Sequence, residues 1–369
     1  MSDERNAHLV GPEAGLAKSG PASASARWAL ACRRLLTGWW WPTVLMLGLS
    51  LWRIGTPAAW NDELATWGAV REPWDNLLAL SWHSDAVITP YYLVLHLWAL
   101  AFGTSDAALR IPSAMAIVVA CALVTRLGIR LHSRHAGIVA GLLFALTPSM
   151  SRVAQEARVY AFVIMFAALA TLLLLRVLER PSAAWLTAYG VSVAALGLAH
   201  LMGLFLLLAH AGAVVAAWIL ASPPGPKPPG SRPPGPKPPA PKPLTLTWRW
   251  AAACVVGCLP AVPLALAGRS QSGQIGWIPP SSAGALLDLV TGLTRSTAVG
   301  GLVVGLAIAH RLHRRAGVLV LGWAVLPVAG LFAAGLVFPV FLSRYLLFVL
   351  PAWLLLGATA VARPPAWRP

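Results

Sequence analysis

The chain alternates between long apolar segments and short polar ones. Ten of the apolar segments come close to the roughly 20 residues that a membrane-spanning helix needs. The apolar run from Ala183 to Ala221 is too long for one span, so we divide it near His200, in "LAHLMG". The pattern predicts an all-α polytopic membrane protein with about ten transmembrane helices. The predicted spans are 38–54, 111–129, 136–150, 159–177, 183–199, 201–220, 248–268, 296–310, 316–335 and 345–361.

A further segment, "YYLVLHLWALAF" at 91–102, is strongly apolar but has only twelve residues. At a rise of about 1.5 Å per residue it reaches roughly 18 Å, which is less than the ~30 Å thickness of the hydrocarbon core. We therefore expect this segment to lie in the outer interface or to dip partway into the membrane. It would then belong to a large first outer loop, 55–109, that contains short interfacial helices.

The distribution of charge supports this topology. The sequence has 28 basic and 12 acidic residues and a net charge of +16. With ten spans and both termini in the cytoplasm, 20 of the 28 basic residues are cytoplasmic and 8 of the 12 acidic residues are outside. This is the bias expected of membrane proteins, whose cytoplasmic loops are rich in Lys and Arg. Topology accounts for the positive charge, so no nucleic-acid partner is implied.

The composition agrees with a multi-pass protein of the cytoplasmic membrane. The chain is 58% hydrophobic and 11% charged, and its mean hydropathy is +0.70. Soluble domains average about 25% charged residues.

A proline-rich segment interrupts the predicted spans. Residues 222–243 contain "PPGPKPP" twice, a composition that favours polyproline II and cannot form a core. We interpret the segment as a semi-rigid linker, with a docking site for a proline-binding module as the alternative. The predicted organisation is a basic cytoplasmic tail (1–37), an N-terminal transmembrane module (38–221) with catalytic outer loops at 55–109 and 151–158, a cytoplasmic linker (222–247) and a C-terminal transmembrane module (248–369).

Most residues able to carry out chemistry lie in the predicted outer loops. Asp62 and Glu63 are adjacent in "WNDELAT", near the start of the first outer loop. Carboxylates, arginines and aromatic residues thus converge at one lipid surface. The other candidates are His83 and Asp85 in the same loop, Gln155, Glu156 and Arg158 in "SRVAQEARVY", Trp277 in "GQIGWIPP", and Arg344 and Tyr345 in "LSRYLLF".

Three arginines, Arg110, Arg158 and Arg344, lie on the outer side against the general charge bias. Such residues are either interfacial anchors whose side chains reach out of the lipid, or ligands of a phosphate group. Convergence of cations and carboxylates suits a reaction on a lipid-linked phosphate. Its leaving group is already anionic and needs cations, whereas an acceptor hydroxyl needs a base. A hydrolase with two carboxylates flanking a glycosidic bond is a different arrangement, and nothing here requires a second carboxylate.

Several motifs in order resemble a known family. They are "WNDELAT", "PYYLVLHLWALAFGTSDAALRIPSAM", "RHAGIVAGLLFALTPSMSRVAQEARVYAF" and "SRYLLFVLP". Together they look like bacterial C-fold glycosyltransferases of the actinobacterial type, the polyprenyl-phosphate-sugar-dependent membrane enzymes that include protein mannosyltransferases and aminoarabinose transferases. The resemblance covers roughly residues 38–361.

The resemblance implies roles for individual residues. Asp62 corresponds to the family's catalytic base, and Glu63 to the neighbour that supports the acceptor or the site geometry. His83, Asp85, Gln155 and Trp277 are possible substrate-binding residues, although Trp277 suits an interface anchor equally. The residues implied to bind the donor or its phosphate are Arg110, Glu156, Arg158, Arg344 and Tyr345.

Two departures from the family pattern bear on function. The second outer loop reads "QEAR", with a single carboxylate and no Asp-x-Asp, so we expect neither a metal site nor another cofactor. The sequence ends at "RPPAWRP", soon after the "RY" motif, where relatives often continue with further spans or an outer domain.

We therefore predict a glycosyltransferase that moves a sugar from polyprenyl phosphate to an acceptor hydroxyl on the outer face of the cytoplasmic membrane. The expected sugar is mannose. The expected partners are the lipid-linked donor, the bilayer and a protein or glycolipid acceptor. Alternatives are a transporter or flippase of lipid-linked precursors, or an inactive truncated relative acting as a subunit. Transporters place ionisable residues inside their helices, whereas these spans are almost free of charge.

Overall fold

The structure is a computed structural model that describes residues 38–219 and 243–362, without the side chains of residues 243 and 314. Every regular element within these ranges is a helix. The predicted all-α polytopic membrane fold is confirmed. The basic tail and most of the proline-rich linker lie outside the described residues, and the predicted division into modules stays a prediction.

The first half of the chain forms one succession of helices. It holds α2 (Trp41–Leu51), α3 (Asn61–Ala69), α4 (Trp74–His83), α5 (Thr89–Phe102), α6 (Asp106–Leu131), α7 (Arg134–Leu146), α8 (Pro148–Ala154), α9 (Tyr160–Glu179), α10 (Ala183–Ala199), η1 (Leu201–Phe205) and α11 (Leu206–Ile219).

The second half continues from Pro243, five residues before the predicted start of the seventh span. It holds α12 (Pro243–Cys258), η2 (Leu259–Ala261), α13 (Val262–Ser270), η3 (Ser272–Ile275), α14 (Ala283–Thr294), α15 (Thr297–Ile308), α16 (Arg314–Ala334), η4 (Ser343–Val349) and α17 (Leu350–Val361).

All ten predicted spans are helical, and the chain breaks at His200 as predicted, between α10 and η1. Six continuous helices in the described ranges are long and apolar enough to cross a membrane. Two bent pairs, α7 with α8 at 66° and α14 with α15 at 99°, raise the number to eight if each pair forms one broken span instead of a re-entrant loop. Because α2 and α10 are shorter, the count of ten crossings stays a prediction.

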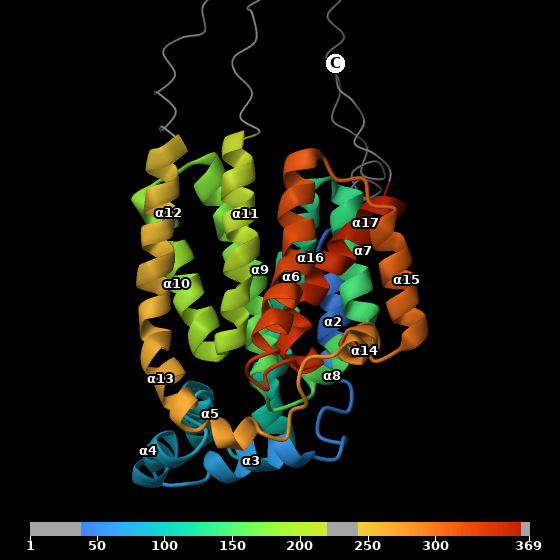
Figure 1. The fold of residues 1–369 in the computed structure, drawn as a ribbon. Helices are drawn as coiled ribbons and strands as arrows, with labels where there is room; N and C mark the ends of the chain where they lie inside the picture. Colours follow the sequence, from blue (N-terminus) through green and yellow to red (C-terminus); the bar gives the residue numbers. More distant parts are fainter. Residues whose placement is uncertain (1–37, 220–242, 363–369) are drawn as a thin grey trace, which may run out of the picture. The chain divides into compact units, whose positions relative to one another are not determined.

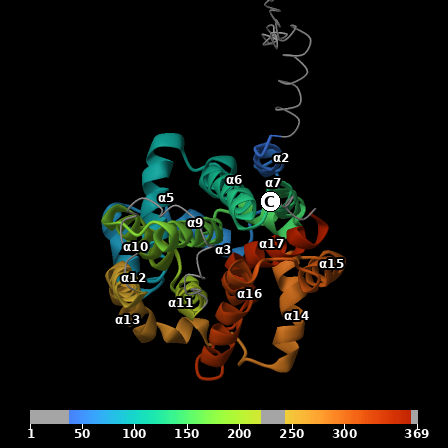
Figure 2. The ribbon, with the colours of Figure 1, turned by 90° about the horizontal axis from the view of Figure 1, so that it is seen from above.

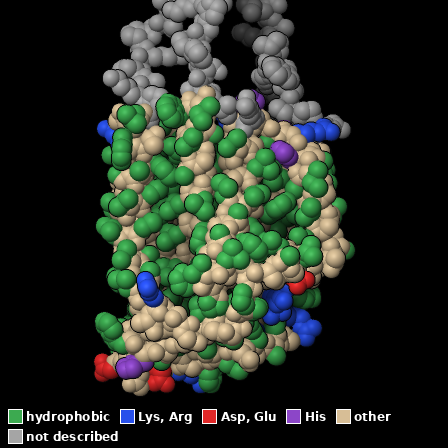
Figure 3. Space-filling model, viewed as in Figure 1, with side chains coloured by type: hydrophobic (Ala, Val, Ile, Leu, Met, Phe, Trp, Pro, Cys, Tyr) green, Lys and Arg blue, Asp and Glu red, His purple; other side chains and the backbone are tan. Residues whose placement is uncertain are grey.

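The long helices stand side by side, and α3 and α4 lie across one end of them (Figures 1 and 2). In Figure 3 apolar side chains cover the middle of the visible face, and charged side chains gather toward its two ends. Segment 91–102 forms α5, which packs against both α4 and α6. The indole nitrogen of Trp98 on α5 donates to the carbonyl of Ala108 on α6 at 2.8 Å.

Small residues let α6 and α7 approach closely. A Cβ added to Gly128 would lie 2.7 Å from the Cα of Gly137, and one added to Gly137 would lie 2.5 Å from the carbonyl oxygen of Thr125. Both distances are too short for any side chain, so glycine is required on both sides of this contact. Such close packing through small residues is a main source of helix association in membranes.

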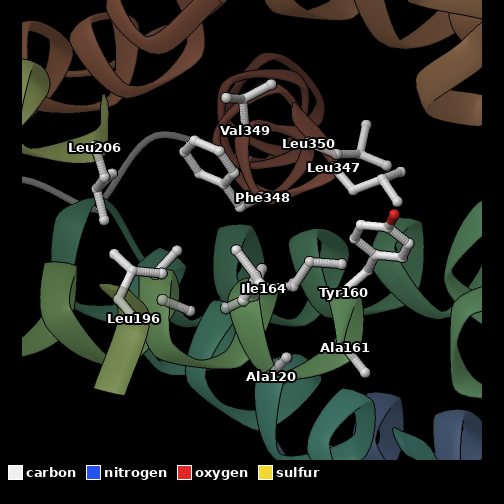
Figure 4. Close-up of a cluster of buried hydrophobic side chains, with 14 of the residues drawn as sticks. Ala120, Tyr160, Ala161, Ile164, Leu196, Leu206, Leu347, Phe348, Val349 and Leu350 are labelled. Carbon is white, nitrogen blue, oxygen red and sulfur yellow. The ribbon is translucent and has the colours of Figure 1, made fainter. Parts of the chain in front are cut away.

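A buried core connects α9, η4 and α17. Tyr160, Ile164, Phe348 and Leu350 are among the side chains that meet there (Figure 4). The fully buried Trp323 of α16 donates its indole N–H to the carbonyl of Phe348 at 3.0 Å. This contact fixes η4, the segment that carries Arg344 and Tyr345.

Candidate active site

Asp62 and Glu63 lie in the first turn of α3, where the helix dipole favours negative charge. Adjacent residues on a helix point in directions roughly 100° apart. Glu63 therefore turns inward and is 4% exposed, whereas the side chain of Asp62 remains 25% exposed. The two neighbouring carboxylates have different surroundings and different partners.

Glu63 forms a buried ion pair with Arg110 of α6. Its carboxylate accepts from Nε at 2.9 Å and from Nη2 at 3.1 Å. The remaining nitrogen of Arg110, Nη1, donates to the carbonyl of Ile54 at 2.9 Å, and the arginine is 1% exposed. Glu63 Oε1 also accepts from the backbone N–H of Ala157 at 2.8 Å. All three nitrogens of Arg110 thus have partners inside the protein, an arrangement that fits a structural clamp.

Asp62 lies between two arginines from distant parts of the sequence. Its Oδ2 is 3.6 Å from Nη2 of Arg158 and 3.3 Å from Nη1 of Arg344. Arg158 is further held by Nη1, which donates to the Asp62 carbonyl at 3.0 Å and to Thr66 Oγ1 at 3.1 Å. Two of the three arginines singled out in the sequence, Arg158 and Arg344, therefore lie within ion-pair distance of the Asp62 carboxylate.

Both arginines keep donor capacity. The Nε atoms of Arg158 and Arg344 are buried, and neither has a hydrogen-bond partner among the described residues. Burial opposes the charge of Arg158, but Tyr160, Tyr92 and Asp62 nearby outweigh it and raise the pKa of the guanidinium. Arg158 is therefore a permanent cation, and the unused donors suit an anionic ligand.

A cavity of about 270 Å³ opens beside Arg344. The Arg344 guanidinium lies 5.2 Å from the ring centre of Trp277 and 5.7 Å from that of Trp60, within the range of cation–π contacts. Trp277, for which the sequence left two interpretations, is thus a wall of the cavity, although 62% of it is exposed. The lining residues are Trp60, Ser149, Arg152, Val153, Glu156, Tyr160, Trp277, Gly292, Arg295, Leu342, Ser343, Arg344 and Leu347.

Glu156 lines the same cavity and pairs with Arg152, one turn earlier on α8. Burial raises the pKa of the Glu156 carboxyl, and Arg152 acts in the opposite direction. Arg295 lies at the sharp bend between α14 and α15 in a left-handed conformation, with φ of 61°. The cavity therefore combines three arginines with one carboxylate.

The sequence interpretation did not select Trp60, Arg152 or Arg295. Arg295 satisfies the criterion applied to the other outer arginines, namely a position on the outer side against the charge bias. Arg152 could be recognised as the i,i+4 partner of Glu156. Trp60 is the first residue of the "WNDELAT" motif, from which only the two acidic residues were selected.

The remaining predicted site residues, Tyr345, Asp85 and His83, have other contacts. Tyr345 packs at 4.7 Å from His200, ring centre to ring centre, and 5.8 Å below the Arg344 guanidinium. Asp85 accepts from the hydroxyl of Tyr92 at 3.3 Å. His83 is exposed on α4, and its Nδ1 lies 2.9 Å from the carbonyl oxygen of Ala79, one turn earlier on the same helix.

Gln155 has a local structural contact. Its amide donates to the carbonyls of Leu49, Ser50 and Trp52 at 3.2, 3.3 and 2.7 Å. These carbonyls belong to the end of α2, where helix carbonyls have no partner within the helix. Gln155 therefore caps α2 and ties it to the second outer loop.

Among residues 38–219 and 243–362, no group of three or more His, Cys, Asp or Glu side chains is arranged to hold a metal ion. Glu156, the carboxylate that could have contributed to a metal site, is paired with Arg152 instead. The residues present at this centre suit an organic phosphate.

The fold and the site define a helical membrane protein with a cationic, carboxylate-bearing centre at one end of its helices. The crystal structure of ArnT from Cupriavidus metallidurans bound to undecaprenyl phosphate has this fold, with a TM-score of 0.55 and 17% identity. The apo structure of the same protein has a TM-score of 0.55 and 16% identity. The alignments cover 91% and 92% of this chain, and in both cases 60% of ArnT.

A family model described as dolichyl-phosphate-mannose-protein mannosyltransferase matches residues 89–227. A comparison with curated proteins gives no match. The family match and the fold confirm the resemblance predicted from the motifs, which is to the polyprenyl-phosphate-sugar-dependent membrane glycosyltransferases.

Proposed function

We propose that the chain is a membrane glycosyltransferase that moves a sugar from a polyprenyl-phosphate donor to an acceptor hydroxyl, with Asp62 as the general base. The observation that carries this proposal is the position of the Asp62 carboxylate, 3.6 Å from Arg158 and 3.3 Å from Arg344. A base and two phosphate-binding cations at one point are the groups that this transfer needs.

The proposed reaction proceeds by direct displacement. The acceptor oxygen attacks the anomeric carbon while the bond from that carbon to the phosphate oxygen breaks. The hydroxyl proton passes to the Asp62 carboxylate, and polyprenyl phosphate leaves with one more negative charge. Because this charge develops in the transition state, guanidinium groups aimed at the phosphate stabilise the transition state more than the ground state.

In the structure, Arg158 and Arg344 pair with Asp62. We propose that the donor phosphate takes over both guanidinium groups and leaves the carboxylate free to accept the acceptor's proton. The unpartnered Nε atoms of both arginines support this exchange, since each offers a further donor to the phosphate. Arg110, which the sequence grouped with them, is already engaged with Glu63 and Ile54. We assign it a positioning role.

The cavity beside Arg344 is the proposed place for the donor sugar. Its tryptophan walls and polar groups suit a sugar ring, which offers apolar faces and hydroxyl edges. Mannose is the sugar that we propose first, since the matching family model carries that name. We place the reaction on the outer face of the cytoplasmic membrane, on the basis of the charge bias of the loops.

The test is transfer by the purified full chain in proteoliposomes. Synthetic polyprenyl-phosphate donors carrying mannose or aminoarabinose are supplied, and released polyprenyl phosphate and labelled acceptor are both measured. The proposal expects release of polyprenyl phosphate together with labelled acceptor. Movement of intact donor across the bilayer without cleavage would support the flippase alternative and overturn the proposal.

A further inference from the structure

A second cavity with polar walls lies far from Asp62. Arg130, which lines it, is twenty residues beyond Arg110 on α6, a distance of roughly 30 Å along the helix. The cavity has a volume of about 450 Å³ and lies among α6, α9, α11, α12 and α16, at the helix ends opposite α3 and α4 (Figure 1). The cavity is therefore separate from the centre around Asp62.

The polar side of this cavity carries two arginines against one carboxylate. Arg130, Arg315 and His313 line it, and the one acidic residue in its wall, Glu179, is paired with Arg130 through Nε and Nη2. The third nitrogen of Arg130, Nη1, is buried and has no hydrogen-bond partner among the described residues. A buried cationic donor without a partner is unfavourable unless an anion or water binds it.

The other side of the cavity is apolar. Leu175 and Leu178 of α9, Val214 and Trp218 of α11, and Leu319 of α16 form it. The site thus has a cationic part and a hydrocarbon part next to each other, at an end of the helices where apolar surface gives way to charge (Figure 3). Its volume falls within the range of specific ligand sites.

We propose that this cavity binds an anionic glycerophospholipid. The lipid phosphate lies against Arg130 Nη1 and Arg315, and one acyl chain follows the apolar wall formed by α9, α11 and α16. Free phosphate uses only the cationic part and leaves the apolar wall uncovered. A lipid with a choline headgroup brings a cation of its own toward the arginines. Basic pockets between transmembrane helices are a recurrent way of binding anionic headgroups.

The test uses the purified full chain in detergent with three probes: dioctanoyl phosphatidylglycerol, dioctanoyl phosphatidylcholine and inorganic phosphate. Affinity is measured by titration of the thermal midpoint, and bound lipid is counted by native mass spectrometry. We expect phosphatidylglycerol to bind at least about tenfold more tightly than phosphatidylcholine, a difference of about 1.4 kcal/mol. Phosphate alone is expected to give no comparable shift.

Two variants address the two parts of the cavity. Arg315→Gln removes a cation, and Ala217→Trp fills the space between α11 and its neighbours. Each is expected to weaken phosphatidylglycerol binding at least tenfold. Two matched controls make the same kinds of change outside the cavity. Arg311→Gln removes an arginine that precedes α16, and Val215→Trp introduces a tryptophan at an exposed position of α11. Both controls are expected to retain wild-type affinity.

Equal binding of the two lipids, or a shift by phosphate alone equal to that by phosphatidylglycerol, would overturn the proposal. Unchanged affinity in Arg315→Gln would do so as well. Since Arg315 is exposed, this variant decides the question even where Ala217→Trp does not fold.

Discussion

Arg158 and Arg344 reach Asp62 in different ways. Arg158 is anchored by the Asp62 carbonyl and Thr66, whereas Arg344 lies within cation–π distance of the rings of Trp60 and Trp277. Arg158 is therefore the more rigid of the two, and Arg344 the one whose surroundings allow it to follow a ligand.

Replacement of either arginine by Ala is expected to weaken donor affinity and slow transfer. A hydrogen bond to a charged group contributes about 1.5–3 kcal/mol, so each loss corresponds to roughly 10- to 100-fold. Arg344→Lys keeps the charge without the planar fork and should lose less than Arg344→Ala. Donor affinity and turnover are measured separately in detergent. Unchanged values in both Ala variants would leave these arginines as interfacial anchors.

His200 gives a pH-dependent prediction. Burial, followed by Arg158 and Arg344 nearby, lowers the pKa of His200 to about 4. Its Nδ1 accepts from the backbone N–H of Met202, which requires a neutral ring nitrogen. The pKa of His200 is thus lower in the folded protein than its value of about 6.5 in the unfolded chain. The folded state therefore keeps its full stability above pH 6.5 and loses stability as the pH falls toward 4.

His200→Asn keeps a side-chain acceptor at this cap but does not titrate. The thermal midpoint of the wild type in detergent should therefore fall between pH 6.5 and 4 more steeply than that of His200→Asn. Parallel pH profiles for the two proteins would show that His200 does not contribute to the acid sensitivity.

At the level of elements, the buried Glu63–Arg110 pair joins three segments. Glu63 comes from α3, Arg110 from α6, and the Ala157 N–H from the loop before α9. This contact fixes the turn of α3 that carries Asp62 relative to Arg158. Breaking a buried pair by removing one partner usually costs about 3–5 kcal/mol, because the other charge is left unpaired.

We therefore expect Arg110→Met to lower the free energy of unfolding by about 3–5 kcal/mol and to reduce transfer through loss of geometry. The double variant Glu63→Leu with Arg110→Met should be more stable than Arg110→Met alone. Arg71→Ala, which removes an exposed arginine that contacts Thr104 and the ring of Trp67, is the control and should change stability by no more than about 1 kcal/mol. Equal stability of Arg110→Met and wild type would contradict the clamp.

The helices were largely predictable from sequence, and the partners of the site residues were not. The length of the apolar runs correctly predicted a helix within each of the ten segments. One histidine within a long apolar run marked the break at His200. The pairing of Glu63 with Arg110, 47 residues away in the sequence, depends on how α3 packs against α6. Similarly, the 99° bend after Thr294 brings Arg295 into the cavity and has no counterpart in apolar periodicity.

For the whole molecule, the charge bias predicts which end of the helices faces outward. After removal of the native cysteines, Asp75→Cys on α4 should react with an impermeant thiol reagent added to intact cells. Ser231→Cys in the proline-rich segment should react only after the cells are permeabilised. Labelling of Ser231→Cys in intact cells would contradict both the ten-span topology and an outward-facing site.

We propose that Asp62 is the base in a sugar transfer from polyprenyl phosphate. The most direct test compares wild type and Asp62→Asn for donor affinity and for polyprenyl-phosphate release in the presence of acceptor. General base catalysis typically contributes about 10²- to 10⁴-fold. We expect a loss of that size in the release rate of Asp62→Asn, with donor affinity retained. Release by Asp62→Asn at the wild-type rate would rule out Asp62 as the base.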